Sequence, residues 1–280
     1  MSNRIENEVK LVTLNDVPVL MAENINNSGG AECFFSTRLG GVSSGSYGAM
    51  NLNLFKTNDN VPNARKNFNI FCNAVSISID SLVAGREKHT NNIAIVDKSS
   101  LLSDFFDRDK YQDHIDGIIT QDSDITLFAY GSDCMLFMFF DPSKRVVAAV
   151  HAGWKGSLNG IVPKAVKIMV DEFQCSPTDI LVALSPSIGH CCFEVDEPVK
   201  LLFEDYDGSF SKHISYRQEK NKYHIDLLRI NLELLKKSGI SQNNIAYSSY
   251  CTMCDDDLFH SYRRDKGDNG VNGAFIKLLR

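Results

Sequence analysis

Two residues of the kind that bind metal ions or act as nucleophiles flank one predicted β-hairpin. Residues 125–156 read ITLFAYGSDCMLFMFFDPSKRVVAAVHAGWKG, in which Cys134 precedes one apolar run and His151 follows the next. Asp, Pro, Ser and Lys at positions 141–144 predict a turn, because Asp suits the first position of a type I turn and Pro presets φ at the second. The pattern therefore predicts two antiparallel strands with Cys134 and His151 at their open end.

The register of this hairpin decides how close the two residues come. If the strands close on Phe140 and Arg145, continuing the register outward pairs Cys134 with His151. Side chains paired across two strands have Cβ atoms about 4.5–5.5 Å apart. A thiolate and an imidazole at that distance can share one metal ion or one proton.

Each of these residues also has an ordinary structural explanation. Cys134 is small enough to fill a core, and His151 could be a strand-end histidine with satisfied hydrogen bonds. Glycines at 131, 153 and 156 lie close by and would let the backbone approach a ligand. On the residues alone, a structural role and a metal-binding or catalytic role both stay open.

The elements that must position these residues indicate an α/β (α+β) fold with mixed β-sheets flanked by helices. Short apolar runs rich in β-branched and aromatic residues predict strands at 93–96, 125–130, 135–140, 146–150, 180–184 and 245–250. Helical spacing predicts a helix over 160–173 and another from an N-cap at Asp226 to a stop at Gly239. No repeat or linker divides the chain, so residues 1–280 are expected to form one domain.

Charge and composition narrow the class of partner. The formal net charge is −6, so the field of the whole protein repels nucleic acid and anionic membranes. The N-terminal residues MSNRIENEVK are polar, and no apolar run approaches the ~20 residues of a membrane span. The sequence predicts a cytoplasmic protein whose eight cysteines are mostly reduced.

Several longer segments resemble the YfiH family, whose members were formerly called multicopper polyphenol oxidases or laccase-domain proteins and are now regarded as purine nucleoside phosphorylases. These segments are FFSTRLGGVSSGSYGAMNLNL, REKHTNNIAIV, GSDCMLFMFFDP, VVAAVHAGWKGSLNGIV, SPSIGHCCFEV and CTMCDDDLFHSYRRD. The resemblance runs from about residue 34 to residue 264.

The resemblance implies three metal-binding or catalytic residues, which fall on His89, Cys134 and His151. A Cys/His/His set with a fourth position left for water or substrate is a catalytic zinc arrangement. The family further implies phosphorolysis of adenosine, inosine, guanosine and methylthioadenosine, together with hydrolytic deamination of adenosine. Purine nucleosides and phosphate are the expected partners, with copper as the alternative metal and an undetermined oligomeric state.

A phosphorolytic enzyme needs cations for phosphate, and arginine supplies bidentate donors. Arg38 in TRLGGVS and Arg264 in SYRRD are the candidates, and Asn51 either contacts a ligand or caps a turn. The chain departs from the family after residue 265: it reads KGDNGVNGAF where the family commonly has Thr-Gly-Arg. Phosphate binding is therefore expected to be weaker or differently built.

The remaining cysteines are expected to be structural. Cys251 and Cys254 have a CxxC spacing, but a zinc ribbon needs a second such pair and the sequence has none. Cys191 and Cys192 are adjacent, so their side chains would point apart in an extended chain.

Three other functions compete with nucleoside chemistry. A copper polyphenol oxidase needs a blue site plus a trinuclear cluster, which would use more than the seven histidines present. A cysteine hydrolase would use Cys134 as nucleophile and His151 as base. A non-enzymatic metal-binding assembly factor has no distinct feature in the sequence.

Overall fold

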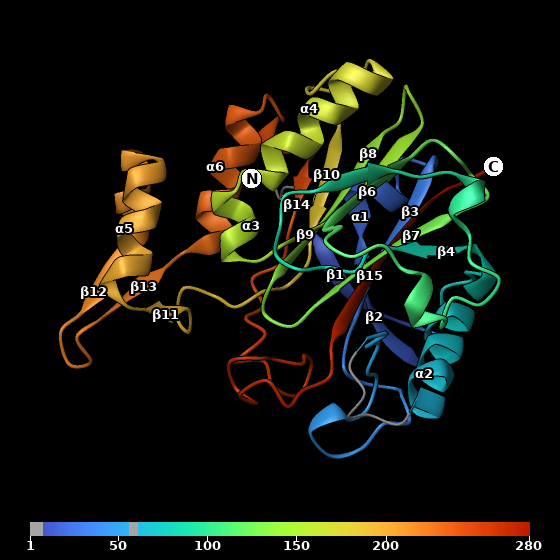
Figure 1. Ribbon diagram of the computed structural model, residues 1–280, viewed down its shortest axis with the longest axis horizontal. Coiled ribbons are helices and arrows are strands. Elements are labelled where there is room, and N and C mark those ends of the chain that lie inside the picture. Colours follow the sequence, from blue (N-terminus) through green and yellow to red (C-terminus); the bar gives the residue numbers. More distant parts are fainter. Residues whose placement is uncertain (1–7, 56–60) are drawn as a thin grey trace, which may run out of the picture.

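Two six-stranded sheets packed face to face form the centre of the computed structural model, which describes residues 8–55 and 61–280 (Figure 1). The first sheet has the order β1 (Val9–Leu14), β2 (Val17–Ala22), β3 (Ala31–Ser36), β15 (Asn272–Leu278), β7 (Thr126–Gly131) and β4 (Leu82–Ala84). The second has the order β14 (Ile245–Ala246), β10 (Leu181–Leu184), β8 (Met135–Asp141), β9 (Val146–Ala152), β6 (Gly117–Thr120) and β5 (Ile93–Ile95).

Successive side chains of β8 point alternately into two hydrophobic cores, one on each face of the second sheet. Leu136, Met138 and Phe140 point into the core shared with the first sheet, whereas Phe137 and Phe139 point into the core beneath the helices. All residues of β8 are buried, because both faces of the second sheet are covered. This accounts for the uninterrupted apolar run in the sequence.

Helices cover the outer faces of the two sheets. α4 (Ile161–Phe173) packs on β9, and α6 (Leu227–Lys237) packs on α4. α2 (Val61–Ala74) covers the first sheet, where Phe71 stacks on Phe275 with ring centroids 4.6 Å apart. The shorter helices are α1 (Glu23–Asn26) and α3 (Trp154–Leu158), with 3-10 turns at Gly45–Tyr47, Ile79–Ser81, Lys98–Ser100, Arg108–Lys110, Gly208–His213 and Gln242–Asn244.

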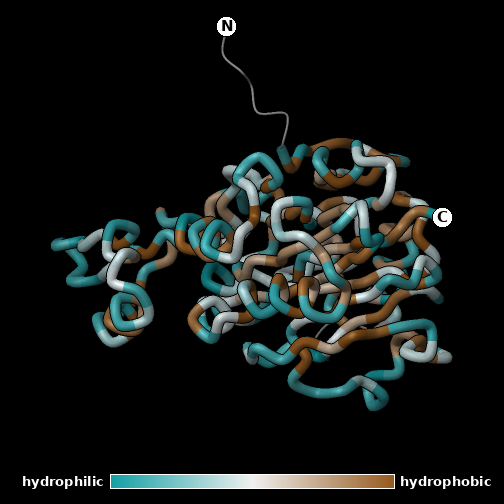
Figure 2. The backbone as a smooth tube through the Cα atoms, turned by 90° about the horizontal axis from the view of Figure 1, so that it is seen from above, coloured by the Kyte–Doolittle hydropathy of each residue, from teal (hydrophilic) through white to brown (hydrophobic). Residues whose placement is uncertain are grey.

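A small lobe stands out from one side of the molecule (Figures 1 and 2). It contains a three-stranded sheet of β11 (Glu194–Val195), β13 (Lys222–Ile225) and β12 (Ile214–Arg217), together with α5 (Glu197–Tyr206). Its own core includes Phe203 and Phe210, which cluster with Ile230 and Leu234 of α6. The segment that leads into the lobe, residues 185–193, passes the site described below.

The expected mixed α/β architecture is confirmed, as are the helix over 160–173 and the N-cap at Asp226, whose carboxylate accepts a hydrogen bond from the Arg229 N–H at 3.0 Å. The strand predicted over 245–250 is shorter than expected: it pairs with β10 at Ile245 and Ala246, and Tyr247 forms an isolated bridge with Glu8. The assignment of residues 1–280 to one domain stays a prediction.

The predicted hairpin register is wrong by two residues. The strands close on Asp141 and Val146, so His151 pairs with Leu136 rather than with Cys134. Arg145, which was expected to be the first residue of the second strand, instead has φ +53° and belongs to the turn. The loop has the predicted four residues, but it is shifted by one position to 142–145 and ends in the left-handed region at Arg145.

No helix among residues 8–55 and 61–280 is long and apolar enough to cross a membrane. Residues 1–7, part of the polar N-terminal stretch, lie outside the described residues.

Candidate active site

His89, Cys134 and His151 meet at one end of the second sheet, where each offers a ligand atom within 4.8 Å of the others. His89 lies in the loop between β4 and β5, Cys134 in the β7–β8 turn, and His151 near the end of β9. The two imidazole rings have centroids 5.0 Å apart. Burial and the charge of His151 lower the pKa of His89, which favours its neutral, metal-binding form. The structure thus brings together the three residues expected from the resemblance.

A buried aspartate, Asp116, holds this arrangement in place. Its carboxylate accepts hydrogen bonds from the backbone N–H groups of His89 at 2.8 Å and Thr90 at 2.9 Å. The Thr90 hydroxyl donates to it at 2.7 Å, and the Lys88 N–H lies 3.2 Å from both oxygens. His151 Nδ1 lies 3.0 Å from the same carboxylate. One side chain therefore fixes both the loop that carries His89 and the ring of His151.

The charges around His151 favour a positive charge at this position. Burial alone would raise the pKa of Asp116, but hydrogen bonds from His151 and Thr90 lower it to about 2. Burial would lower the pKa of His151, yet the charges of Glu87 and Cys134 and the hydrogen bond to Asp116 raise it well above its usual range. Burial raises the pKa of Glu87 to about 8.

The donor set fits a metal ion. Because Asp116 is ionised, it accepts the Nδ1 proton of His151 and leaves Nε2 of that ring as the ligating nitrogen, a common device at zinc sites. A bound cation would take the place of the proton that the carboxylates otherwise favour at His151. Two imidazoles and one thiolate are ligands that suit zinc or copper.

Gly153 leaves space for the side chains of Cys134 and His89. A Cβ at this position would lie 2.9 Å from the Cys134 sulfur and 3.2 Å from His89 Nδ1. The glycine after the second apolar run is therefore required by close contact with the site.

A cavity of about 340 Å³ opens beside His89 and Cys134. This volume lies within the range of small-ligand pockets. Its wall combines apolar and aromatic side chains with two cations. The lining residues outside the centre are Ser132, Asp133, Gly153, Trp154, Lys155, Ile188, Phe193, Leu227, Tyr262 and Arg263.

Asp133, the residue before Cys134, is hydrogen bonded to three separate segments around the cavity. One carboxylate oxygen accepts a hydrogen bond from the Thr252 hydroxyl at 2.6 Å, and the other accepts one from the Arg263 N–H at 2.6 Å. Its carbonyl accepts one from the Ile188 N–H at 3.0 Å. Three segments that are distant in the sequence are thereby fixed next to Cys134.

Comparison with known proteins places this geometry in a family. The family model described as "Multi-copper polyphenol oxidoreductase laccase" matches residues 32–279. The chain belongs to this family. The crystal structure of the Bacillus licheniformis hypothetical protein YfiH, another protein of this fold, superposes with a TM-score of 0.87 at 28% identity, over 93% of this chain and 96% of that one.

Related proteins of the laccase-like family carry names of purine enzymes. The purine nucleoside phosphorylase LACC1 of Mus musculus is 30% identical over 87% of this chain and 55% of its own length. The chain thus spans about half the length of that mammalian relative. The purine nucleoside phosphorylase YlmD of Bacillus subtilis is 29% identical over 86% of both chains. The adenosine deaminase RL5, from an unknown prokaryotic organism, is 27% identical over 68% of this chain and 72% of its own.

The arginines expected to bind phosphate lie outside the cavity wall. Arg38 donates to the carbonyls of Gly48 at 2.8 Å and Asp256 at 2.9 Å. Arg264 pairs with Asp265 at 3.0 Å and also donates to backbone carbonyls. These contacts are those of residues that hold loops, so a role in phosphate binding stays a prediction for both.

Asn51 is fully buried, and its side-chain oxygen accepts hydrogen bonds from the backbone N–H groups of Asn53 at 3.1 Å and Val271 at 3.0 Å. This is closer to the turn-capping alternative than to ligand contact.

Sequence reasoning missed Asp116, Lys155 and Arg263 as parts of the site. The signal for Asp116 was a carboxylate at the start of the apolar segment GIIT, where a strand begins. Lys155 follows Trp154 in the HAGWKG segment, and Arg263 immediately precedes the arginine that was chosen.

Proposed function

We propose that this chain is a zinc-dependent purine nucleoside phosphorylase that also deaminates adenosine. The observation that carries the proposal is the convergence of His89, Cys134 and His151 at a cavity that also presents cations and aromatic rings. The names of the relatives support the substrate class. When bound by the three side chains, zinc would supply a Lewis acid and lower the pKa of a water molecule.

Lys155 and Arg263 supply positive charge for phosphate. In phosphorolysis, a phosphate oxygen forms a bond to ribose C1′ while the bond from C1′ to the purine nitrogen breaks, and the base takes up a proton. Because the net charge of the protein is −6, this phosphate depends on local cations. Both side chains line the cavity that opens at Cys134.

The apolar part of the cavity accepts the purine ring. Phe193 and Trp154 offer aromatic faces, and the Arg263 guanidinium carbon lies 5.7 Å from the centre of the Phe193 ring. Aromatic rings stack on bases in many nucleotide sites. Arg263 is thus placed between the proposed positions of base and phosphate.

A cysteine hydrolase is a second candidate, because a ring nitrogen of His151 lies within 4.8 Å of the Cys134 sulfur. Such a pair can form a nucleophile and its base. The copper oxidase alternative has less support. Among residues 8–55 and 61–280, two groups of side chains could hold a metal, and their combined total is two histidines. A trinuclear copper cluster would need more.

The experiment that tests the proposal incubates the purified chain with adenosine, with and without inorganic phosphate, and separates the products by chromatography. With phosphate, we expect adenine and ribose 1-phosphate, together with inosine from deamination and hypoxanthine from its phosphorolysis. Without phosphate, we expect inosine alone. Absence of conversion in both reactions, or phenol oxidation that follows copper content, would contradict the proposal. Product formation that needs neither phosphate nor metal would favour the cysteine hydrolase.

A further inference from the structure

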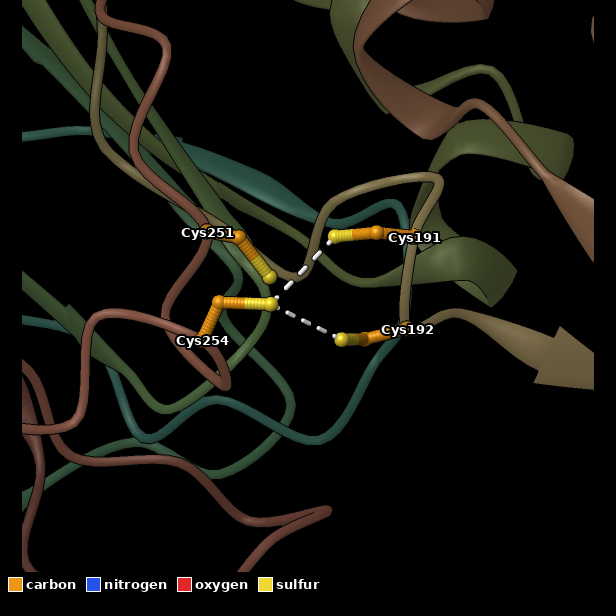
Figure 3. Close-up of side chains that lie close together, drawn as sticks. All are labelled: Cys191, Cys192, Cys251 and Cys254. Atoms are coloured by element: carbon orange, nitrogen blue, oxygen red, sulfur yellow. Dashed lines mark hydrogen bonds between the residues drawn. The ribbon is translucent and has the colours of Figure 1, made fainter.

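Four cysteines outside the candidate active site converge between two loops (Figure 3). Cys191 and Cys192 come from the turn that leads into the lobe, and Cys251 and Cys254 come from the segment after β14. All four sulfurs lie within 4.8 Å of one another. The Cys254 sulfur is 3.5 Å from that of Cys191 and 3.3 Å from that of Cys192.

This arrangement corrects two expectations from the sequence. Cys191 and Cys192 do not point apart, because residues 190–192 form a turn rather than an extended strand. They act as the second pair that the CxxC motif of Cys251 and Cys254 was expected to lack. The pair was not visible in the sequence because its two cysteines are adjacent and lie about sixty positions upstream.

The sulfur separations match those of a single tetrahedral metal ion. With zinc–sulfur bonds of about 2.3 Å, tetrahedral geometry puts neighbouring sulfurs about 3.8 Å apart. The observed separations, from 3.3 Å up to the 4.8 Å limit, bracket this value. They exceed a disulfide bond of about 2.05 Å. An iron–sulfur cluster, with several metal atoms inside the ring of thiolates, would require wider spacing than one ion.

Main-chain contacts hold the four cysteines in position. The Gly189 N–H donates to the Cys251 sulfur at 3.2 Å, and the Thr252 N–H donates to the Ser187 carbonyl at 3.0 Å. The Cys251 N–H donates to the Asp255 carboxylate at 2.7 Å. The Gly189 N–H, which donates directly to a sulfur, would also stabilise the charge of a ligating thiolate.

Gly189 leaves room for the sulfurs. A Cβ at this position would lie 3.2 Å from the Cys191 sulfur and 3.4 Å from that of Cys251. Cys191 and Cys254 are exposed, so packing in a core does not explain why these sulfurs come together.

We propose that Cys191, Cys192, Cys251 and Cys254 bind one zinc ion as a closed structural site. Four protein sulfurs leave no position for water or substrate, which is typical of structural rather than catalytic zinc.

Such an ion would join the loop that carries Ile188 and Phe193 to the segment that carries Tyr262 and Arg263. All four of these residues line the substrate cavity. The hydrogen bond from Thr252, which lies inside the CxxC motif, to Asp133 connects the cluster to the residue beside Cys134.

The test measures the metal content of the full chain after dialysis in reducing, metal-free buffer. Cys191→Ser and Cys254→Ser are each expected to lose one equivalent of zinc relative to the unsubstituted chain. Cys134→Ala is expected to lose a separate equivalent, and Cys175→Ala, a cysteine outside both clusters, is expected to lose none. Circular dichroism checks that each variant is folded.

X-ray absorption of the Cys134→Ala protein provides an independent arm, because it reports only the remaining zinc. We expect four sulfur neighbours at about 2.3 Å. The proposal would be overturned by unchanged metal content in Cys191→Ser and Cys254→Ser, by nitrogen neighbours in the Cys134→Ala spectrum, by iron or copper in place of zinc, or by a mass showing a disulfide among the four cysteines. The variant differences test this cluster whether or not the nucleoside chemistry is correct.

Discussion

The two sulfur-containing clusters of this protein differ in composition and in what surrounds them. His89, Cys134 and His151 combine two imidazoles with one thiolate, rest on the buried carboxylate of Asp116, and open into a cavity of about 340 Å³. The four-cysteine cluster has sulfur ligands alone, lies between two loops, and has two exposed members.

The comparison indicates that the number of protein ligands, together with the structure that holds them, predicts whether a metal centre is catalytic or structural. A three-ligand centre at the end of a sheet leaves a position for water or substrate, whereas four thiolates complete the shell of one ion. In the first cluster the precision comes from strands and Asp116, and in the second it would come from the metal itself. The first is therefore suited to chemistry and the second to joining the loops of the cavity wall.

A large difference in metal affinity between the clusters is expected from Asp116→Asn. The amide would lose the charge that holds His151 and would present N–H groups toward the donors of His89 and Thr90. Loss of a hydrogen-bond partner behind a metal ligand typically costs ~10–100-fold in metal affinity or activity. We expect a loss of that size in the zinc affinity of the first cluster, measured by competition with a chromophoric chelator.

The zinc affinity of the four-cysteine cluster should be unchanged in Asp116→Asn. Asp171→Asn serves as a matched control, because Asp171 is a surface residue paired with Lys167 one helical turn away. Equal losses at both clusters would mean that Asp116 acts through general stability, and the distinction between the clusters would fail.

A smaller effect is expected from the two cations that line the cavity, Lys155 and Arg263. Removing a charge-assisted hydrogen bond costs about 1.5–3 kcal/mol, and each ~1.4 kcal/mol is tenfold in affinity. We therefore expect Arg263→Ala and Lys155→Ala to raise the KM for phosphate about tenfold, with less effect on phosphate-independent deamination. Steady-state kinetics with varied phosphate provide the measurement.

Arg38→Ala and Arg264→Ala are the matched comparison, because the sequence pointed to these two arginines. The guanidinium groups of all three arginines donate to backbone carbonyls, but Arg263 lines the cavity and Arg38 and Arg264 do not. We therefore expect any loss in Arg38→Ala or Arg264→Ala to affect both reactions alike. A selective rise in phosphate KM for Arg38→Ala or Arg264→Ala would restore the prediction from the sequence and show that phosphate binds outside the cavity described above.

The sequence predicted which residues form the candidate active site better than it predicted the strand register that brings them together. Two continuous apolar runs located the β8–β9 hairpin, yet the register was two residues off, because nothing local indicated that Arg145 adopts a left-handed conformation. Cys134 and His151 are close despite this error, since both remain at the open end of the hairpin. His89 came from the resemblance alone.

Contacts between distant segments explain what the sequence did not reveal. Asp116 contacts residues up to 35 positions away, and no local pattern marks a buried carboxylate as a hydrogen-bond acceptor for a separate loop. The four cysteines likewise combine two segments that only the tertiary fold brings together. Hydrophobic periodicity and turn-forming residues are local signals. They therefore predicted helices, strands and turns, but not these contacts between distant segments.

Turnover of adenosine by two cysteine variants tests the central claim most directly. With phosphate present and equal amounts of folded protein, we expect Cys134→Ala to lose nucleoside turnover by ~1,000-fold or more. Cys254→Ser is expected to keep a kcat of the same order as that of the unsubstituted chain. Retained turnover in Cys134→Ala would contradict the assignment of the chemistry to His89, Cys134 and His151. If a folded Cys254→Ser protein had lost turnover at the same time, the chemistry would belong to the four-cysteine cluster instead.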